Sequence, residues 1–298
     1  MNDEAGTRAA RAVQGRQLGI VIALTGTFLV VEAVGGLVSG SLALVSDAGH
    51  MFTDLLALVL CLMAVRFASL PATAEKTYGY HRLEILTALL NGALLLVISA
   101  GLLLKALQRF VDPRPIRGRL MIGVALLGLL ANLAALLILS RRHRSLNIRG
   151  ARMHLIGDAL SSCGVVVAAL VIAATGWVRI DAIAGGLIAC VIVVGALRLV
   201  REAVDVLLEA APRGIGLDEV SKAIRTVPGV VEVHDLHVWS ITTGLPALSG
   251  HVRVEGVAGT GHDAMLNRIK QTVRDRFGIV HTTIQIESST YQELGEVH

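Results

Sequence analysis

The chain has 298 residues, of which 54% are hydrophobic and only 17% are charged. An ordinary soluble domain is roughly 45–50% apolar and about 25% charged, so this composition predicts an integral membrane protein. The formal net charge of +4 is modest and gives no support for nucleic acid as a partner.

Six apolar stretches are long enough to cross a bilayer as helices, which takes on the order of 20 residues. They are Gly19–Leu37, Leu42–Val65, Ile85–Leu107, Leu120–Leu139, His154–Val178 and Ile180–Val200. We therefore expect an α-helical integral membrane protein with six transmembrane helices over residues 17–208, after a cytoplasmic segment at residues 1–16. Cys61, Cys163 and Cys190 are isolated within these stretches and are expected to be small core residues.

Arginine residues predict the orientation, because positive charge gathers on the cytoplasmic side of a membrane. They precede the first stretch and crowd the connection between the fourth and fifth: Arg8, Arg11, Arg16, Arg141, Arg142, Arg144, Arg149 and Arg152. The connection between the third and fourth stretches opposes this pattern with Arg109, Arg114, Arg117 and Arg119. The balance still favours a multi-pass protein of the plasma (inner) membrane with both termini in the cytoplasm.

The pattern His-x-x-x-Asp occurs twice, as His50 with Asp54 and as His154 with Asp158. Residues four apart share one face of a helix, and the second and fifth spans run in opposite directions. His50 is then level with Asp158, and Asp54 is level with His154. Two imidazoles and two carboxylates in a tetrahedron suit Zn²⁺, and ionisable groups at membrane depth normally face a cavity or a partner. The sequence predicts an intramembrane zinc site.

Two further acidic residues in these stretches are left unassigned. Asp47 lies one turn before His50, and its role can be that of a proton relay, a vestibule charge or a plain helix-end contact. Glu32 stands alone in the first stretch and is equally ambiguous. Glycines predict close helix packing that allows the helices to slide or rock: Gly35, Gly36, Gly185, Gly186 and Gly195.

The composition changes after Leu208, and residues 209–298 are charged and alternating. We expect a cytoplasmic α+β domain with the order α-β-β-α-β and its helices on one face of a small sheet. Asp218 is expected to cap a first helix that runs to Val227. The other expected elements are strands Val230–Thr242 and Leu248–Glu255, helix Gly261–Phe277 and strand Val280–Glu287.

Several motifs together resemble the cation diffusion facilitator family. They are Ser39-Gly-Ser-Leu-Ala-Leu-Val-Ser-Asp-Ala-Gly-His-Met-Phe-Thr-Asp54, Tyr78-Gly-Tyr-His-Arg-Leu-Glu84, His154-Leu-Ile-Gly-Asp158, His234-Asp-Leu-His-Val-Trp239 and Thr283-Ile-Gln-Ile-Glu287. The resemblance implies a homodimeric, proton-coupled exporter of divalent metal, with its transport site on spans two and five and a metal-binding tail. Histidine at position 50 resembles the zinc-selective branch, which also accepts cadmium.

The resemblance also implies a second metal site in the tail. It places His234, His251 and Glu287 near the tail metal positions, with His262 or Asp263 contributing. Departures from the family pattern are Gln285 in the tail and Lys76 and Tyr80 in the second connection, where relatives carry histidines. The alternative is a polar sheet face that pairs with the second protomer. His237 and Trp239 are expected to pack, and Arg82 and Glu209 match positions that form a charge contact in the family.

Ligand protonation connects metal binding to protons. Zinc requires neutral imidazole and ionised carboxylate, so protons expel the metal, and imidazole titrates at about pH 6.5. We therefore expect a secondary active transporter, a metal/proton antiporter for Zn²⁺ and also Cd²⁺ or Co²⁺, rather than an enzyme. The alternatives are an intramembrane zinc metalloenzyme, against which no His-Glu-x-x-His motif occurs, and a membrane metal sensor.

Overall fold

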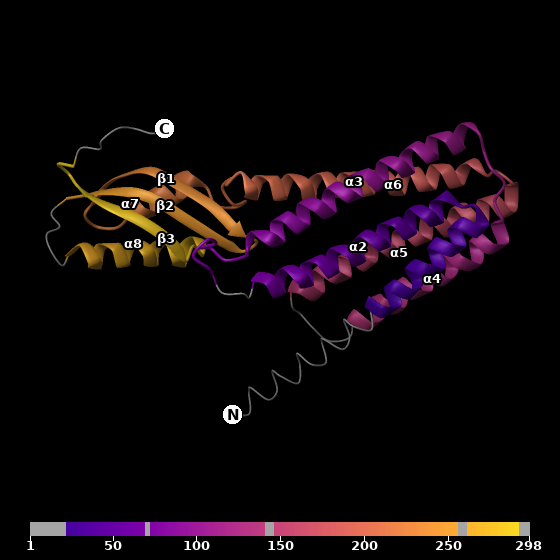
Figure 1. Cartoon of the computed structure of the whole chain (residues 1–298), viewed down its shortest axis with the longest axis horizontal. Coiled ribbons are helices and arrows are strands. Elements are labelled where there is room, and N and C mark those ends of the chain that lie inside the picture. The colour runs from indigo at the N-terminus through magenta and orange to yellow at the C-terminus, as the bar shows by residue number, and fades with distance from the viewer. Residues whose placement is uncertain (1–21, 69–71, 141–145, 256–260, 292–298) are drawn as a thin grey trace, which may run out of the picture. The chain divides into compact units, whose positions relative to one another are not determined.

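The computed structural model describes residues 22–68, 72–140, 146–255 and 261–291 (Figure 1). The chain forms two compact units. The first, the membrane unit, comprises the chain up to Leu60 together with Leu90–Leu199, and the second, the tail unit, comprises Cys61–Leu89 and Val200–His298.

The described residues include six long helices, which correspond to the six apolar stretches. They are the helix Ile22–Ser39, α2 (Leu42–Ala68), α3 (Arg82–Val111), α4 (Gly118–Ser140), α5 (Leu146–Thr175) and α6 (Arg179–Leu207). Five have the length and hydropathy of a membrane span within the described residues, and α2 is 27 residues long. The expected start of the first stretch, at Gly19, lies outside the described residues.

A surrounding lipid bilayer explains why the outer surface of these helices is apolar. α3 exposes a row of large apolar side chains that includes Leu90, Val97 and Leu104, exposed by 64%, 71% and 61%. A contiguous apolar surface of this kind is unfavourable in water but suits the hydrocarbon of a bilayer. Cys163 and Cys190 lie on the same kind of exposed surface, so the prediction that they are core residues is wrong for both. The side chain of Cys61 is outside the described set.

Small residues set the spacing within the membrane unit. One buried cluster joins α2, α4 and α5: Ala43, Leu44, Met121, Val124, Ala125, Val165, Ala168, Ala169 and Ile172. A Cβ on Gly35 would lie 2.6 Å from Val124, and a Cβ on Gly185 would lie 3.2 Å from the backbone of Ala43. The predicted close packing is confirmed there and at Gly36, whereas a Cβ on Gly186 would make an ordinary contact with Ala106. It is wrong at Gly195, where no described atom lies within 4 Å.

The tail unit contains a three-stranded sheet with two helices. Its further elements are α7 (Leu217–Arg225), β1 (Val230–Thr242), β2 (Leu245–Val254), α8 (Gly261–Phe277) and β3 (His281–Ser288). β2 is central, antiparallel to β1 and parallel to β3. Gly216, rather than Asp218, is the N-cap of α7, and it makes no side-chain cap hydrogen bond. Asp218 instead lies in the first turn, where its negative charge favours the helix dipole.

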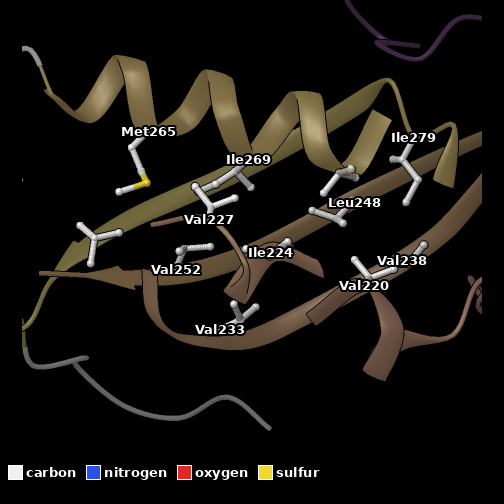
Figure 2. Packing of buried hydrophobic residues seen from close by; sticks show 12 residues of the cluster. Val220, Ile224, Val227, Val233, Val238, Leu248, Val252, Met265, Ile269 and Ile279 are labelled. Carbon is white, nitrogen blue, oxygen red and sulfur yellow. The ribbon is translucent and has the colours of Figure 1, made fainter. Parts of the chain in front are cut away.

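One hydrophobic core joins the helices to one face of the sheet (Figure 2). α7 contributes Val220 and Ile224, and α8 contributes Ile269, all fully buried. On β2 the alternate residues Leu248 and Val252 point into this core. Because side chains alternate along a strand, His251 and its neighbours occupy the opposite face, which leaves polar groups of all three strands together there.

Candidate metal centre

The structure brings His50 of α2 and Asp158 of α5 together in the membrane unit. Nε2 of His50 lies 3.7 Å from Oδ1 of Asp158, and Asp158 is only 6% exposed. Asp54 and His154 lie one turn further along the same two helices, but their side chains fall outside what the structure describes. The adjoining cavity of about 540 Å³ reaches His50 and Ser161 and is otherwise lined by apolar residues and glycine.

Asp47 is fixed by serines of α5. The hydroxyl of Ser161 donates to its Oδ1 at 2.6 Å, and the hydroxyl of Ser162 lies 3.2 Å from its Oδ2. Asn132 of α4 donates to Ser162 in turn, at 3.0 Å. Of the three possibilities left open for Asp47, a plain helix-end contact is wrong, because this carboxylate is 3% exposed and hydrogen-bonded to a neighbouring helix.

These contacts define the packing direction of α2 and α5. From Asp47 to His50 the chain advances three residues along α2, while the partner on α5 recedes from Ser161 to Asp158. The two helices are therefore antiparallel, as the sequence predicts. One further turn along each brings the backbone positions 54 and 154 to the same level.

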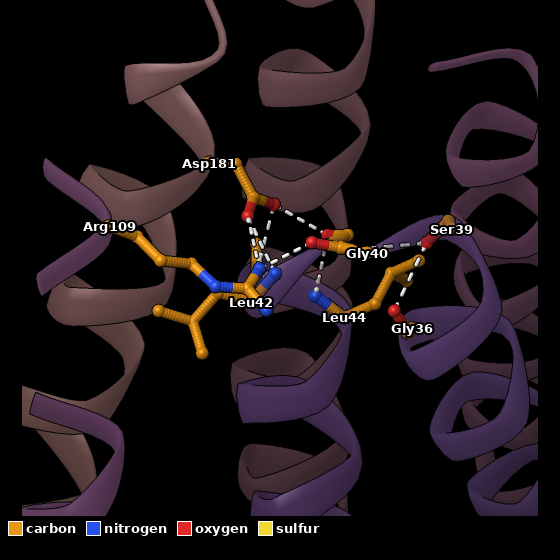
Figure 3. Close-up of polar contacts among 9 residues, drawn as sticks. Gly36, Ser39, Gly40, Leu42, Leu44, Arg109 and Asp181 are labelled. Carbon is orange, nitrogen blue, oxygen red and sulfur yellow. Dashed lines mark hydrogen bonds and ion pairs between the residues drawn. The ribbon is translucent and has the colours of Figure 1, made fainter. Parts of the chain in front are cut away.

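A second carboxylate, Asp181 of α6, holds the amino end of α2 (Figure 3). It is 1% exposed and accepts hydrogen bonds from the Ser41 hydroxyl at 2.5 Å and from the backbone N–H groups of Leu42 and Ala43 at 2.6 and 3.2 Å. Arg109 of α3 lies 3.9 Å from the same carboxylate and also donates to the carbonyl of Gly40. Sequence reasoning missed this role, although a carboxylate in the first turn of an apolar span is a signal for it.

The tail unit gathers a second group of ligand-type side chains: His234, His251 and Glu287. One candidate ligand atom from each lies within 4.8 Å of the others. Nε2 of His234 is 3.3 Å from Oε2 of Glu287, and Nδ1 of His251 is 3.0 Å from Oε1. Strand register explains the cluster, because His234 pairs with His251 across β1 and β2, and β3 runs alongside.

The other expected tail residues lie around this group. Within the described chain His262, in the first turn of α8, is not part of the cluster. Gln285 donates to Oε1 of Glu287 at 3.0 Å, so it supports the carboxylate rather than replacing a histidine. His237 is exposed and lies 2.9 Å from Asp235; the expectation that it packs is wrong, because a register shift in β1 turns it outward.

The tail unit also includes the beginning of α3. Arg82 lies 2.7 Å from Glu209, which confirms the charge contact, and Glu84 accepts a hydrogen bond from Thr242 at 2.6 Å. Arg82 and Glu209 are both exposed, so their ion pair contributes at most about 1 kcal/mol. Lys76 lies 4.5 Å above the Tyr80 ring, which is a cation–π contact between two residues of the second connection.

Comparison with known families divides the chain in two. Residues 18–208 match the model of the cation efflux transmembrane domain. Residues 212–289 match the model of the cation efflux protein cytoplasmic domain, a dimerisation domain.

Curated relatives match over almost the whole chain. The zinc transporter ZitB of Shigella flexneri is 40% identical over 91% of this chain and 87% of its own length. The metal cation efflux system protein CzcD of Cupriavidus metallidurans is 41% identical over 91% of this chain and 86% of its own. The cadmium, cobalt and zinc/H(+)-K(+) antiporter of Bacillus subtilis is 36% identical over 91% and 88%.

A solved structure, the metal-bound C-terminal domain of CzcD, is 41% identical and covers 24% of this chain and 99% of its own, with a TM-score of 0.23. The matched transmembrane model and the ZitB and CzcD relatives mark a multi-pass inner-membrane protein that transports metal cations and is not an enzyme. The chain belongs to the cation efflux, or cation diffusion facilitator, family.

Proposed function

We propose that this protein exports Zn²⁺ from the cytoplasm in exchange for protons. The observation that carries the proposal is the approach of His50 and Asp158 from two antiparallel helices of the membrane unit. Relatives named for zinc, cadmium and cobalt transport, one of them a zinc/H(+)-K(+) antiporter, support the choice of metal and of proton exchange. Cd²⁺ and Co²⁺ are further substrates under this proposal.

The transport site consists of His50, Asp54, His154 and Asp158. Two nitrogen and two oxygen ligands match the tetrahedral preference of zinc, whereas calcium and magnesium require more oxygen ligands. The site loads metal when its imidazoles are neutral and its carboxylates are ionised, and it releases metal when protons return. Under this proposal both termini lie in the cytoplasm, and the site loads metal from the cytoplasmic side.

Proteoliposomes test this exchange directly. With an acidic lumen and the cytoplasmic face outward, we expect radiolabelled zinc to accumulate while the lumen becomes more alkaline. A protonophore should abolish the accumulation. Zinc uptake that is indifferent to the pH gradient and moves no protons would contradict the proposal, and protein-free liposomes provide the background.

The tail cluster is proposed as a regulatory zinc site in the homodimer. His234, His251 and Glu287 supply its ligands within one protomer. A site that binds zinc only in the folded state stabilises the fold in proportion to its saturation. The alternative, a polar sheet face that pairs with a second protomer, makes no such prediction.

Zinc should therefore raise the melting temperature of the tail unit. The sequence contains two tryptophans, Trp177 and Trp239, so Trp177→Phe leaves Trp239 of β1 as the reporter, and Asp158→Ala removes the membrane site. At a zinc concentration one hundred times the dissociation constant the stabilisation is about 2.7 kcal/mol. His234→Ala with His251→Ala should remove it, whereas the matched change His237→Ala on the same strand should retain it. If zinc does not change the melting temperature of the tail unit before any histidine is replaced, the cluster has a structural role rather than a metal-binding one.

A further inference from the structure

The proposed zinc site does not include a buried carboxyl group of the first helix, Glu32. Glu32 lies near the middle of the helix Ile22–Ser39 and is 1% exposed. Among the described residues no hydrogen-bond donor reaches either of its carboxylate oxygens, and no lysine, arginine or histidine forms an ion pair with it. An ionised carboxylate without partners is strongly disfavoured at membrane depth, so this side chain is expected to carry a proton in the state that the structure describes.

α4 leaves space for this carboxyl group. Gly128 is buried opposite it, and a Cβ at that position would collide with the Glu32 carboxylate. Any other residue at position 128 would force the carboxyl group to move. The lack of a side chain at position 128 therefore makes room for the Glu32 carboxyl group.

Among the side chains that the structure describes, the two charged groups that act on Glu32 are both acidic. Asp47 of α2 and Asp158 of α5 are near enough to repel a negative charge on it, and α4 presents Gly128. Asp47 is held in place by Ser161 and Ser162. Divalent metal bound at His50 and Asp158 would cancel part of this repulsion, so metal loading favours ionisation of Glu32 and metal release favours its protonation.

We propose that Glu32 is a proton-carrying residue of the transport cycle, distinct from the metal ligands. When Zn²⁺ binds, the O–H bond of the neutral acid breaks, the carboxylate keeps the electron pair and the proton passes to water on the cytoplasmic side. When Zn²⁺ leaves on the opposite side, the carboxylate takes up a proton there. The inference rests on the proposed zinc–proton exchange and adds a proton site outside the four-ligand cage.

The full-length variant Glu32→Gln tests the role, because its amide mimics the permanently protonated acid in shape. In proteoliposomes without a pH gradient, exchange of radiolabelled zinc for unlabelled zinc should continue. Acceleration of zinc uptake by a pH gradient should fall roughly tenfold or more. Fewer protons should be released on zinc binding to the purified variant. Glu202→Gln is the matched control, since it removes only the exposed ion pair with Arg213 and should behave as the native protein.

The outcomes separate this inference from the proposed function. If the native protein shows no response to the pH gradient, zinc–proton exchange itself is wrong. If the native protein responds and Glu32→Gln responds equally, the proton-carrying role of Glu32 is wrong while the exchange stands. If Glu32→Gln binds zinc normally but also loses zinc–zinc exchange, Glu32 is needed for metal passage, which likewise overturns the proposal.

Infrared difference spectroscopy provides a test that does not require Glu32→Gln to fold. The native protein should show the carbonyl band of a protonated carboxyl group that disappears when zinc is added. Glu32→Asp retains an acid and should shift that band. A band that is absent, or unchanged by both zinc and the substitution, would contradict the proposal.

Discussion

Replacing Asp158 with alanine is expected to abolish zinc transport while leaving a folded protein. Asp158 is 6% exposed and lies 3.7 Å from the His50 imidazole, so its removal takes a charged oxygen ligand from the proposed cage. Loss of an outer partner of a metal ligand already costs about 10–100-fold in affinity or activity, and loss of a ligand itself should cost at least about 100-fold. The initial rate of zinc uptake into proteoliposomes measures this directly.

A matched substitution distinguishes loss of a ligand from loss of structure. Asp218→Ala removes an exposed aspartate from the first turn of α7 and should transport at the native rate. Size-exclusion chromatography and circular dichroism should show both variants folded and of the same size. Native transport by Asp158→Ala would rule out the four-ligand cage.

The second large effect is expected on stability, from Asp181→Ala. The change removes three hydrogen bonds at the amino end of α2 and leaves the partly buried Arg109 without its carboxylate. Loss of a helix cap costs about 0.5–2 kcal/mol, and breaking a buried ion pair costs about 3–5 kcal/mol. Because Arg109 keeps the Gly40 carbonyl as a partner, we expect a total loss of about 3 kcal/mol.

Trp177 lies just before α6 and reports on this region once Trp239 has been replaced by phenylalanine. Its fluorescence during thermal unfolding in detergent measures the loss. Asp181→Asn keeps an oxygen acceptor and should lose less than Asp181→Ala. Asp112→Ala, an exposed aspartate between α3 and α4, is the control. Equal melting of Asp181→Ala and the native protein would mean that the carboxylate does not hold α2.

Hydropathy predicts which segments are helical much better than it predicts where they end. α5 begins at Leu146, eight residues before the expected His154, and α6 continues to Leu207 rather than to Val200. Both extensions carry charged residues, among them Arg149 and Arg201, which belong to a helix but not to a bilayer. A search for apolar stretches therefore finds the part of each helix that lies in the bilayer and misses the polar extension beyond it.

The sequence predicts those parts of the site that follow from a local spacing pattern. It does not predict those parts that depend on how distant helices are aligned with one another. The four-residue spacing of His50 and Asp54, repeated in α5, pointed to the meeting of His50 with Asp158. The serines that hold Asp47 come from a helix more than one hundred positions away. Asp181 likewise acts on the end of another helix, so its role appears only when α2 and α6 are placed together.

A helix held at one end moves as a lever. Asp181 fixes α2 at Leu42, from which His50 lies about 12 Å and Ala68 about 39 Å along the helix axis at 1.5 Å per residue. A tilt of about 10° around the held end would carry His50 by about 2 Å but Ala68 by about 7 Å. Such a tilt would thus displace the far end of α2 several times farther than the proposed zinc ligand His50, which would move by little more than the length of one covalent bond.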